Sequence, residues 1–369
     1  MYSEKNLKIH EKYMKECLEL AKKGEGFVSP NPIVGSIVLD KEGNVVGRGY
    51  HTKYGEAHAE VNALNQAGDK AEGGTIYVSL EPCSHYGKTP PCIDRIIKEK
   101  IKTLVVGMTD PNPLVSGKGI QKAKEAGLEV IEGVLTKECE KINEIFIKNI
   151  TQKQPFISVK TASTIDGKIA TSTGSSKWIT SESAREEVQR LRNKYDVIIT
   201  GSNTVIADNP SLTCRQKGYI NPIRLVIDSQ LRTSPDSKVY NDDRTRTIIA
   251  VSEKVDKIKL KFYPEYIDVI KCPLNKNNKI DLEYLSQELY SQKISSFLIE
   301  AGGNLNGAFL KHNLIDKVYF FIAPKIIGDF SSKNSFEGFK IENISESTAF
   351  TFGEIKNFTP DIMIEGYLK

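Results

Sequence analysis

Four residues in the first hundred have the types and the order that could hold a catalytic metal. His58 and Glu60 stand two residues apart in GEAHAEVNAL, and Cys83 and Cys92 follow in EPCSHYGKTPPC. Imidazole and thiolate are ligands that zinc prefers, and three protein ligands leave a fourth position for water. Zinc lowers the pKa of such a water toward neutrality, and a nearby carboxylate can then carry protons. The pattern predicts a hydrolytic zinc centre with Glu60 as its proton shuttle.

Each of these residues alone also has an ordinary structural explanation. His58 and Glu60 could be first-turn residues of a helix, and two cysteines near a strand end could simply be buried. Together, H-x-E, a strand and then P-C with a second cysteine match the signature of zinc nucleobase deaminases. The spacing departs from it, because eight residues separate the cysteines where the signature has two. His85 lies in that gap and is the alternative ligand.

The expected secondary structure could bring these ligands together. TIYVSL (75–80) is a strand candidate that leads into Cys83, and the helix expected over 91–100 begins beside Cys92. His58 begins a helix that ends near Gly68, so the ligands could meet at neighbouring helix starts. Further elements expected in this half are a helix over 5–22, a hairpin turning at 40–43, strands at 103–108 and 128–134, and a helix at 120–127. This alternation predicts a sheet with helices on its faces.

The second half alternates in the same way but lacks the metal motif. A polar segment, 148–155, ends in proline, which places the domain boundary near Thr151 and gives domains 1–151 and 152–369. Gly302 and Gly303 follow the strand SFLIE and precede a helix pattern, where backbone N–H groups could bind a phosphate. A tight turn explains the same glycine pair, and the dinucleotide fingerprint is not present. Other strands are expected at YDVIITG, IRLVIDS, TIIAVS and KVYFFIAPKIIG, and a helix at SESAREEVQRLRNK.

Composition limits the class of protein. The chain has 369 residues, 39% apolar and 27% charged, with 51 Lys and Arg against 47 Asp and Glu. No uncharged apolar run approaches the roughly 20 residues of a membrane span, and the near-neutral charge is not that of a nucleic-acid binder. Six cysteines are too sparse for a disulfide scaffold. We expect a soluble, cytoplasmic protein without a secretion signal that binds neither membrane nor nucleic acid.

Three motifs of the first half resemble a known family. SPNPIVG (29–35), HAE (58–60) and EPCSHYGKTPPC (81–92) are similar to the deaminase half of the bifunctional riboflavin-biosynthesis deaminase/reductases, whose cysteines carry this longer gap. The resemblance implies a cytidine-deaminase-like three-layer α/β domain with one catalytic Zn²⁺. By the same resemblance Glu60 is the proton shuttle, the zinc ligands are His58, Cys83 and Cys92, and the pyrimidine substrate lies near Asn31, His51 and Lys88.

The second half resembles the reductase half of the same family. KTASTIDGKIA, SKWIT, GSNTVIADNPSLTCR, LIEAGG and APKIIG occur in the family's order, which implies a dihydrofolate-reductase-like α/β domain using NADPH. The implied cofactor contacts are Ala162, Trp178, Thr204, Asp208, Ser229, Gly302 and Gly303. The implied substrate contacts are Ser176, Arg192, Leu212, Arg215 and Glu300. The two arginines suit a phosphorylated substrate, because guanidinium binds phosphate in a bidentate way; Arg232 is a candidate partner for the cofactor 2′-phosphate.

The resemblance implies a two-step enzyme. Deamination of 2,5-diamino-6-ribosylamino-4(3H)-pyrimidinone 5′-phosphate would be followed by NADPH-dependent reduction of the ribosyl chain, giving 5-amino-6-ribitylamino-uracil 5′-phosphate, and we expect a homo-oligomer. One alternative is a nucleic-acid-editing deaminase with a binding module, which the near-neutral charge disfavours. Another is a structural protein built around zinc, which would need a fourth protein ligand and would leave Glu60 without a role.

Overall fold

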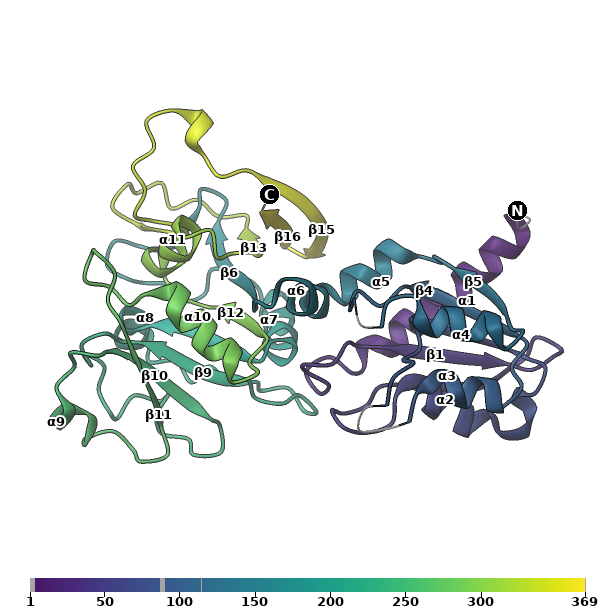
Figure 1. Ribbon diagram of the computed structural model, residues 1–369. Coiled ribbons are helices and arrows are strands. Elements are labelled where there is room, and N and C mark those ends of the chain that lie inside the picture. The colour runs from purple at the N-terminus through teal and green to yellow at the C-terminus, as the bar shows by residue number, and fades with distance from the viewer. Residues whose placement is uncertain (1–3, 87–89, 114, 369) are drawn as a thin grey trace. The chain divides into compact units, whose positions relative to one another are not determined.

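The computed structural model describes residues 4–86, 90–113 and 115–368, and the chain divides into two compact units (Figure 1). The N-terminal unit is Met1–Lys153 and the C-terminal unit is Gln154–Lys369. The boundary expected at residue 151 falls in the last turn of α6 (Glu144–Gln152). The polar segment before the proline is therefore helical as far as Gln152, and the helix ends where Lys153 adopts a left-handed backbone with φ of 54°.

The N-terminal unit has a five-stranded sheet in the order β2-β1-β3-β4-β5. Strand β1 is antiparallel to β2 and β3, whereas β3, β4 and β5 run parallel. The strands are β1 (Gly35–Leu39), β2 (Val45–Tyr50), β3 (Thr75–Leu80), β4 (Thr103–Met108) and β5 (Glu129–Glu132). The alternation of helices and strands found along the sequence is the reason for this arrangement, since parallel strands need helical crossovers.

Helices cover both faces of this sheet and form two apolar cores. One core joins the sheet to α2 (Ala59–Ala67), α3 (Cys92–Lys98) and α4 (Lys118–Glu125). The other joins the opposite face to α1 (Glu4–Lys22) and α5 (Thr136–Ile142). On β3, Ile76 and Val78 belong to the first core and Tyr77 to the second, as the alternation of side chains along a strand requires. The unit is a three-layer α/β sandwich.

Glycines on β2 let helix α2 lie unusually close to the sheet. Gly47 and Gly49 are buried and point at α2, and a methyl group on either would overlap backbone atoms of Ala59 or Ala63. The helix side of the contact is also built from alanines, which are buried. Because α2 begins at Ala59, this contact fixes where His58 and Glu60 lie relative to the strand ends.

The C-terminal unit is built on a nine-stranded sheet in the order β11-β10-β9-β8-β12-β6-β13-β16-β15. The first seven strands in that order run parallel, and β16 and β15 complete the sheet as antiparallel strands. The strands are β6 (Phe156–Thr164), β8 (Val197–Gly201), β9 (Ile223–Ile227), β10 (Thr247–Ser252), β11 (Asp268–Cys272), β12 (Ser296–Ile299), β13 (Lys317–Ala323), β15 (Phe350–Phe358) and β16 (Asp361–Leu368). A separate two-stranded ribbon pairs β7 (Lys168–Ala170) with β14 (Lys333–Asn334).

Four helices connect the parallel strands of this unit, and one large core lies between helices and sheet. The helices are α7 (Glu182–Lys194), α8 (Ser202–Asp208), α10 (Leu282–Ser291) and α11 (Gly303–Lys311), with the short α9 (Lys257–Leu260) beside them. Leu285, Leu289 and Phe309 pack against strand residues in that core. The α/β fold predicted for both halves is confirmed.

The sequence patterns located the central strands but missed several outer elements. The strands expected at TIYVSL, TLVVGM, YDVIITG, IRLVIDS, TIIAVS and SFLIE are present, and the strand expected over KVYFFIAPKIIG is present but ends at Ala323. The missed elements include α5, α6, α8, α9, α10, β11, β14, β15 and β16. Strand β15 explains the difficulty, because most of its residues are exposed and an edge strand with few buried side chains lacks a clear apolar alternation.

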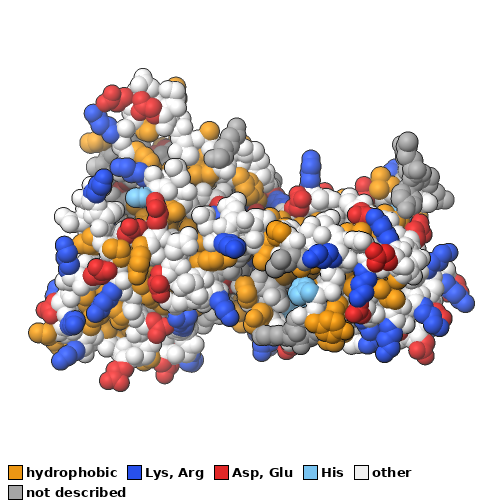
Figure 2. All heavy atoms as spheres, viewed as in Figure 1, with side chains coloured by type: hydrophobic (Ala, Val, Ile, Leu, Met, Phe, Trp, Pro, Cys, Tyr) orange, Lys and Arg blue, Asp and Glu red, His pale blue; other side chains and the backbone are white. Residues whose placement is uncertain are grey.

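The surface of the described residues carries both signs of charge. In the view of Figure 2, Lys and Arg side chains are interspersed with Asp and Glu over both units, in keeping with a formal net charge of +4. Among the described residues, every helix is too short or too polar to cross a membrane.

Gly49→Ala tests the close packing of α2 on β2. The added methyl group must push α2 from the sheet, so we expect a loss of about 1–3 kcal/mol in the unfolding free energy of the N-terminal unit. Differential scanning calorimetry and urea titration would measure it. Arg48→Ala is the matched control on the same strand, because its exposed ion pair with Glu16 (3.6 Å) contributes at most about 1 kcal/mol. Equal stability of Gly49→Ala and wild type would contradict the packing argument.

Candidate active sites

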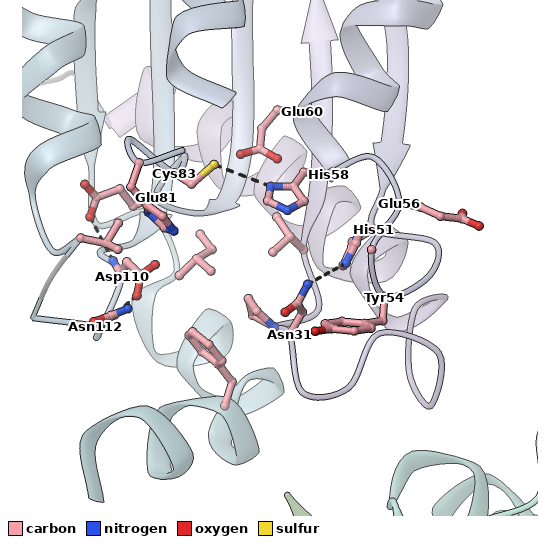
Figure 3. Close-up of a pocket in the computed structure, with 17 residues that line it drawn as sticks. Asn31, His51, Tyr54, Glu56, His58, Glu60, Glu81, Cys83, Asp110 and Asn112 are labelled. Atoms are coloured by element: carbon pink, nitrogen blue, oxygen red, sulfur yellow. Dashed lines mark hydrogen bonds between the residues drawn. The ribbon is translucent and has the colours of Figure 1, made fainter. Parts of the chain in front are cut away.

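A cavity of about 330 Å³ lies at the carboxyl ends of β3 and β4 in the N-terminal unit (Figure 3). Its wall includes His58, Glu60 and Cys83 from the predicted metal motif. The other lining residues are Asn31, Pro32, Val34, His51, Tyr54, Gly55, Glu56, Leu80, Glu81, His85, Asp110, Asn112, Val115 and Phe146. Parallel strands present their carboxyl ends at one edge of a sheet, and ligands commonly bind there.

The three predicted metal ligands meet beside this cavity. His58 directly precedes α2, Cys83 follows β3 and Cys92 is the first residue of α3. The Nδ1 atom of His58 lies 3.7 Å from Cys83 Sγ and 3.2 Å from Cys92 Sγ, and the three ligand atoms lie within 4.8 Å of one another. Tetrahedral zinc with ordinary bond lengths would separate such N and S atoms by about 3.6 Å. The set fits a single zinc ion with one position left open.

Hydrogen bonds between the ligands favour a thiolate at Cys83. The side chain of Cys92, the imidazole of His58 and the Cys92 backbone N–H (3.3 Å) all bind its sulfur, and they lower the pKa of Cys83 to about 4. The Cys83 sulfur in turn raises the pKa of Cys92, and burial adds to this effect. Zinc binds cysteine as the thiolate, so binding of the metal would release the protons that these thiols still carry.

Glu60 lies in the first turn of α2 and is only 4% exposed. Burial raises the pKa of its carboxyl to about 7, and the His58 side chain acts in the opposite direction. It lines the cavity but is not part of the ligand group. A carboxyl that can gain or lose a proton near neutral pH, next to an open metal position, suits proton transfer.

Asn31 and His51 form one side of the cavity. His51 is 3% exposed, and burial lowers the pKa of its imidazole, so the ring is neutral near pH 7. Its Nδ1 lies 3.1 Å from the carbonyl oxygen of Ala57, which can only accept, so Nδ1 carries the proton. Its Nε2 then accepts from the Asn31 amide at 3.2 Å. The pair presents fixed polar atoms to a bound molecule.

The two remaining predictions for this site differ in outcome. His85, the alternative ligand, is exposed and lines the cavity, but the ligand group found among the described residues consists of His58, Cys83 and Cys92. Lys88, an expected substrate contact, lies outside the described residues.

Asp110 and Asn112 are lining residues that motif reasoning missed. They follow β4 directly, and β4 is the parallel neighbour of β3. Burial raises the pKa of the Asp110 carboxyl, and its Oδ1 accepts the N–H of Asn112 at 2.8 Å. The signal was present in TLVVGMTDPN, because polar residues after the next parallel strand reach the same sheet edge.

In the C-terminal unit, predicted cofactor contacts lie at the carboxyl ends of adjacent parallel strands. Ser229 follows β9, Thr204 lies in α8 just after β8, and Gly302 follows β12. Ala162 is near the end of β6, which is the next strand after β12. Gly302 is the residue before the first turn of α11. The space beside its Cα is open, because a Cβ added there would have Thr204 Oγ1, at 4.0 Å, as its nearest neighbour. The buried Gly303 completes a helix start that is open to an anion such as a dinucleotide phosphate.

Three predicted contacts lie nearer the surface of this unit. Trp178 is 63% exposed, and the Arg185 guanidinium lies 4.4 Å from its ring centroid. Lys325 Nζ donates to the carbonyl oxygen of Trp178 at 2.8 Å, so the segment that also carries the half-buried Ser176 is tied to another loop. Asp208 is exposed at the end of α8.

Arg192 and Glu300, two predicted substrate contacts, form a largely buried ion pair. Arg192 Nε and Nη2 donate to the two Glu300 carboxylate oxygens at 2.7 and 2.9 Å, and Nη1 donates to the carbonyl oxygen of Thr213 at 2.9 Å. Their side chains are 12% and 10% exposed. Burial would raise the pKa of Glu300, but Arg192 and Lys160 together lower it. The Arg192 guanidinium is thus bound to Glu300 in this structure, and its contact with the substrate stays a prediction.

Lys160 joins this charge cluster and was missed by the sequence reasoning. It lies on β6, and burial lowers the pKa of its ammonium group while the Glu300 charge opposes that change. Its position inside KTAST gives no signal, since a lysine on a strand is usually solvated. Only the neighbouring order of β12 and β6 brings it near Glu300.

The loop after α8 carries the remaining substrate candidates. Leu212 is buried and has a positive φ of 53°, and Arg215 is exposed, with its backbone N–H bound to Gln189 Oε1 at 2.9 Å. The bond from Arg192 to Thr213 fixes the loop between them. Arg232, the candidate for the 2′-phosphate, donates to Ser202 Oγ at 2.8 Å and Asn203 Oδ1 at 2.6 Å at the start of α8.

Comparison with known proteins matches each unit to a separate family model. A family model described as the cytidine and deoxycytidylate deaminase zinc-binding region matches residues 7–108. A second model, described as the RibD C-terminal domain, matches residues 155–364. The division between the two matched regions corresponds to the two compact units of the structure.

Similar proteins cover nearly the whole chain. The riboflavin biosynthesis protein RibD of Actinobacillus pleuropneumoniae is 42% identical over 355 residues, which are 96% of this chain and 94% of the relative. The RibD protein of Aquifex aeolicus is 42% identical over 358 residues, or 96% of this chain and 98% of the relative.

Solved structures agree with the sequence relatives. The diaminohydroxyphosphoribosylaminopyrimidine deaminase/5-amino-6-(5-phosphoribosylamino)uracil reductase of Thermotoga maritima has a TM-score of 0.87 at 38% identity, covering 99% of this chain and 100% of its own. Acinetobacter baumannii RibD has a TM-score of 0.86 at 35% identity, covering 98% and 99%. The family that the motifs predicted is thus confirmed: the chain belongs to the RibD family of bifunctional deaminase/reductases of riboflavin biosynthesis, with a zinc-binding deaminase domain followed by a reductase domain.

Proposed function

We propose that this chain removes an amino group from 2,5-diamino-6-ribosylamino-4(3H)-pyrimidinone 5′-phosphate in its N-terminal unit and reduces the ribosyl chain of the product in its C-terminal unit. The product of both steps is 5-amino-6-ribitylamino-uracil 5′-phosphate. The observation that carries the proposal is the three-ligand group of His58, Cys83 and Cys92 beside a cavity that also holds Glu60. The full-length similarity to the Thermotoga maritima deaminase/reductase supports the second step.

In the deaminase unit, the cavity residues divide the work between chemistry and binding. A zinc ion on the three ligands would supply a water whose pKa is near neutral. Glu60 would take a proton from that water and deliver one to the departing amino group, which its pKa of about 7 suits. Asn31 and the neutral His51 would hydrogen-bond the pyrimidine ring. We extend that binding role to Lys88 by resemblance.

In the reductase unit, NADPH bound at the carboxyl ends of the parallel strands would supply hydride. The start of α11 at Gly302 and Gly303 would bind cofactor phosphate, and Ala162, Thr204, Asp208, Ser229 and Trp178 would complete the cofactor site. Arg232 would pair with the 2′-phosphate. Its guanidinium donates to the side chains of Ser202 and Asn203, which are uncharged and do not neutralise its positive charge.

The Arg192–Glu300 pair would order the substrate part of this site. Glu300 would accept from the sugar hydroxyls, with Ser176 and Leu212 lining the site, and Arg192 would fix both Glu300 and the loop that carries Arg215. Arg215 is exposed on that loop and is the guanidinium we assign to the substrate phosphate. Lys160, with its lowered pKa, would donate a proton when the sugar ring opens.

The substrate phosphate, the homo-oligomer, the cytoplasmic location and the lack of nucleic-acid or membrane partners stay predictions. Light scattering of the purified protein would measure the oligomeric state. Nucleic-acid binding would be measured by filter retention at two salt concentrations, since phosphate-driven binding weakens steeply with salt.

Glu60→Gln should stop deamination without removing zinc. The amide keeps the shape of the side chain but cannot exchange a proton, so ammonia release should fall by about 10²–10⁴-fold. Coupled ammonia assays and metal analysis would measure both effects in one preparation. Reduction of already deaminated substrate is the internal control and should match wild type. Near-normal ammonia release by the variant would remove Glu60 from the mechanism.

Cys92→Ser should abolish stoichiometric zinc binding and lower the stability of the N-terminal unit, because metal binding and local folding are linked. Metal analysis and a thermal melt would show both changes. Cys17→Ala is the matched control, since Cys17 is buried in the core between α1 and the sheet and lies outside the ligand group. Zinc retained by Cys92→Ser but lost by His85→Ala would establish the alternative ligand instead.

Arg215→Ala should weaken the use of the phosphorylated reductase substrate. Loss of a charge-assisted bidentate contact costs about 2–3 kcal/mol, or roughly a 30- to 150-fold drop in kcat/KM. NADPH affinity, measured by equilibrium titration, should barely change. Lys217→Ala, on the same exposed loop, controls for loss of one positive charge. If NADPH binding weakens as much as substrate use, Arg215 belongs to the cofactor site.

A further inference from the structure

Glu81 is a buried carboxylate beside the metal cavity that is not part of the ligand group. It directly follows β3, two residues before Cys83, and it is 3% exposed. Its side chain points toward the loop that follows β4, as Figure 3 shows. Burial of a carboxylate is costly unless hydrogen bonds compensate it, so the groups that bind Glu81 indicate what it does.

Four backbone N–H groups bind this one carboxylate. Oε2 accepts from Asp110 at 3.0 Å and Gly117 at 2.9 Å, and Oε1 accepts from Gly119 at 2.8 Å and Ile120 at 3.2 Å. The four donors fill the usual hydrogen-bonding capacity of a carboxylate. They come from both ends of one segment, the loop after β4 and the first turn of α4, so Glu81 closes this segment into a fixed loop.

That loop forms a wall of the cavity. Asp110, Asn112 and Val115 line it. In Figure 3, Asp110 and Asn112 lie on the side of the cavity away from His51. Within the loop, Asp110 Oδ1 accepts from the Asn112 N–H, and the Asn112 carbonyl oxygen accepts from the Val115 N–H at 2.9 Å. The two bonds link Val115 to Asn112 and Asn112 to Asp110, and the Asp110 backbone is held by Glu81.

The start of α4 is also pressed against the strand end that carries Cys83. A methyl group on Gly119 would overlap the carbonyl oxygen of Pro82. The ligand-bearing segment and the cavity wall are therefore joined by close backbone packing and by the four bonds to Glu81. Movement of the wall relative to Cys83 would require both to break.

We propose that Glu81 is a positioning residue of the deaminase site, which holds the Asp110–Asn112 wall at a fixed distance from the metal ligands. The wall contacts the bound pyrimidine, whereas Glu60 and the ligands reach the reacting atoms. Loss of the Glu81 charge therefore weakens substrate binding more than it slows the chemical step. The kinetic part of this proposal rests on the proposed deaminase function, and the part concerning loop order does not.

Glu81→Gln tests the kinetic part in the full-length protein. Glutamine keeps the size of the side chain but replaces one oxygen by an NH₂ group that cannot accept the two N–H groups facing it. We expect zinc content equal to wild type, a rise in deaminase KM of at least about tenfold, and a change in kcat below about threefold. The reductase kcat/KM should equal that of wild type, which shows that the C-terminal unit is folded, and the zinc content reports on the N-terminal unit.

The matched control is Glu125→Gln, which removes an exposed carboxylate from α4 and should leave deaminase kinetics unchanged. A wild-type KM for Glu81→Gln would overturn the proposal. So would a loss of zinc equal to the loss of activity, because Glu81 would then act on the metal site and not on the wall.

Amide hydrogen exchange in the wild-type protein tests the loop itself, whether or not the variant folds. The N–H groups of Asp110 and Gly117 should exchange at least about 100-fold more slowly than those of Glu42 and Asn44, which bind the carboxylate of Asp40 in an exposed turn at 3.0 and 2.8 Å. Equal exchange rates in the two places would overturn the proposal. Wild-type protein that releases no ammonia would instead refute the proposed function, and the exchange result would still decide the role of Glu81.

Discussion

The close approach of helix α2 to the glycines of β2 determines where the metal cavity lies. Gly47 and Gly49 leave no room for a side chain, so the helix start that holds His58 and Glu60 has one position relative to the sheet. Cys83 comes from the end of β3 in that same sheet, and Cys92 begins a helix that packs in the same apolar core as α2. The distances between the ligands follow from this packing, because each ligand lies within a few residues of α2, β3 or α3.

Burial then sets the chemistry of the groups that this packing brings together. A carboxylate in water would be ionised at neutral pH, but the pKa of Glu60 is raised to about 7 by the loss of solvent. Glu81 is as deeply buried, yet four backbone N–H groups compensate its carboxylate. Two glutamates in one cavity can therefore have different roles, one in proton transfer and one in holding the wall.

In the reductase unit, a largely buried carboxylate is compensated by an ion pair. Glu300 lies at the end of β12, and a bidentate bond to Arg192 keeps its pKa low in spite of burial. The third donor of Arg192 holds the loop that carries Leu212 and Arg215. A single arginine thus links a strand end to a surface loop, on which Arg215 stays exposed.

The sequence by itself determined the chemistry available to each half. The types and order of His58, Glu60, Cys83 and Cys92 predicted a zinc site, because donor types can be read from the sequence, although the cysteine spacing left His85 as an alternative ligand. Tertiary structure decided which charged side chains bind each other or the backbone. Arg192 binds Glu300, with Lys160 close enough to affect its charge, and Glu81 binds backbone N–H groups between Asp110 and Ile120. These contacts join residues 29 to 140 positions apart in the chain, and strand order and helix packing alone set the distances between them. A sequence shows which atoms can donate or accept, but the fold determines which of them meet.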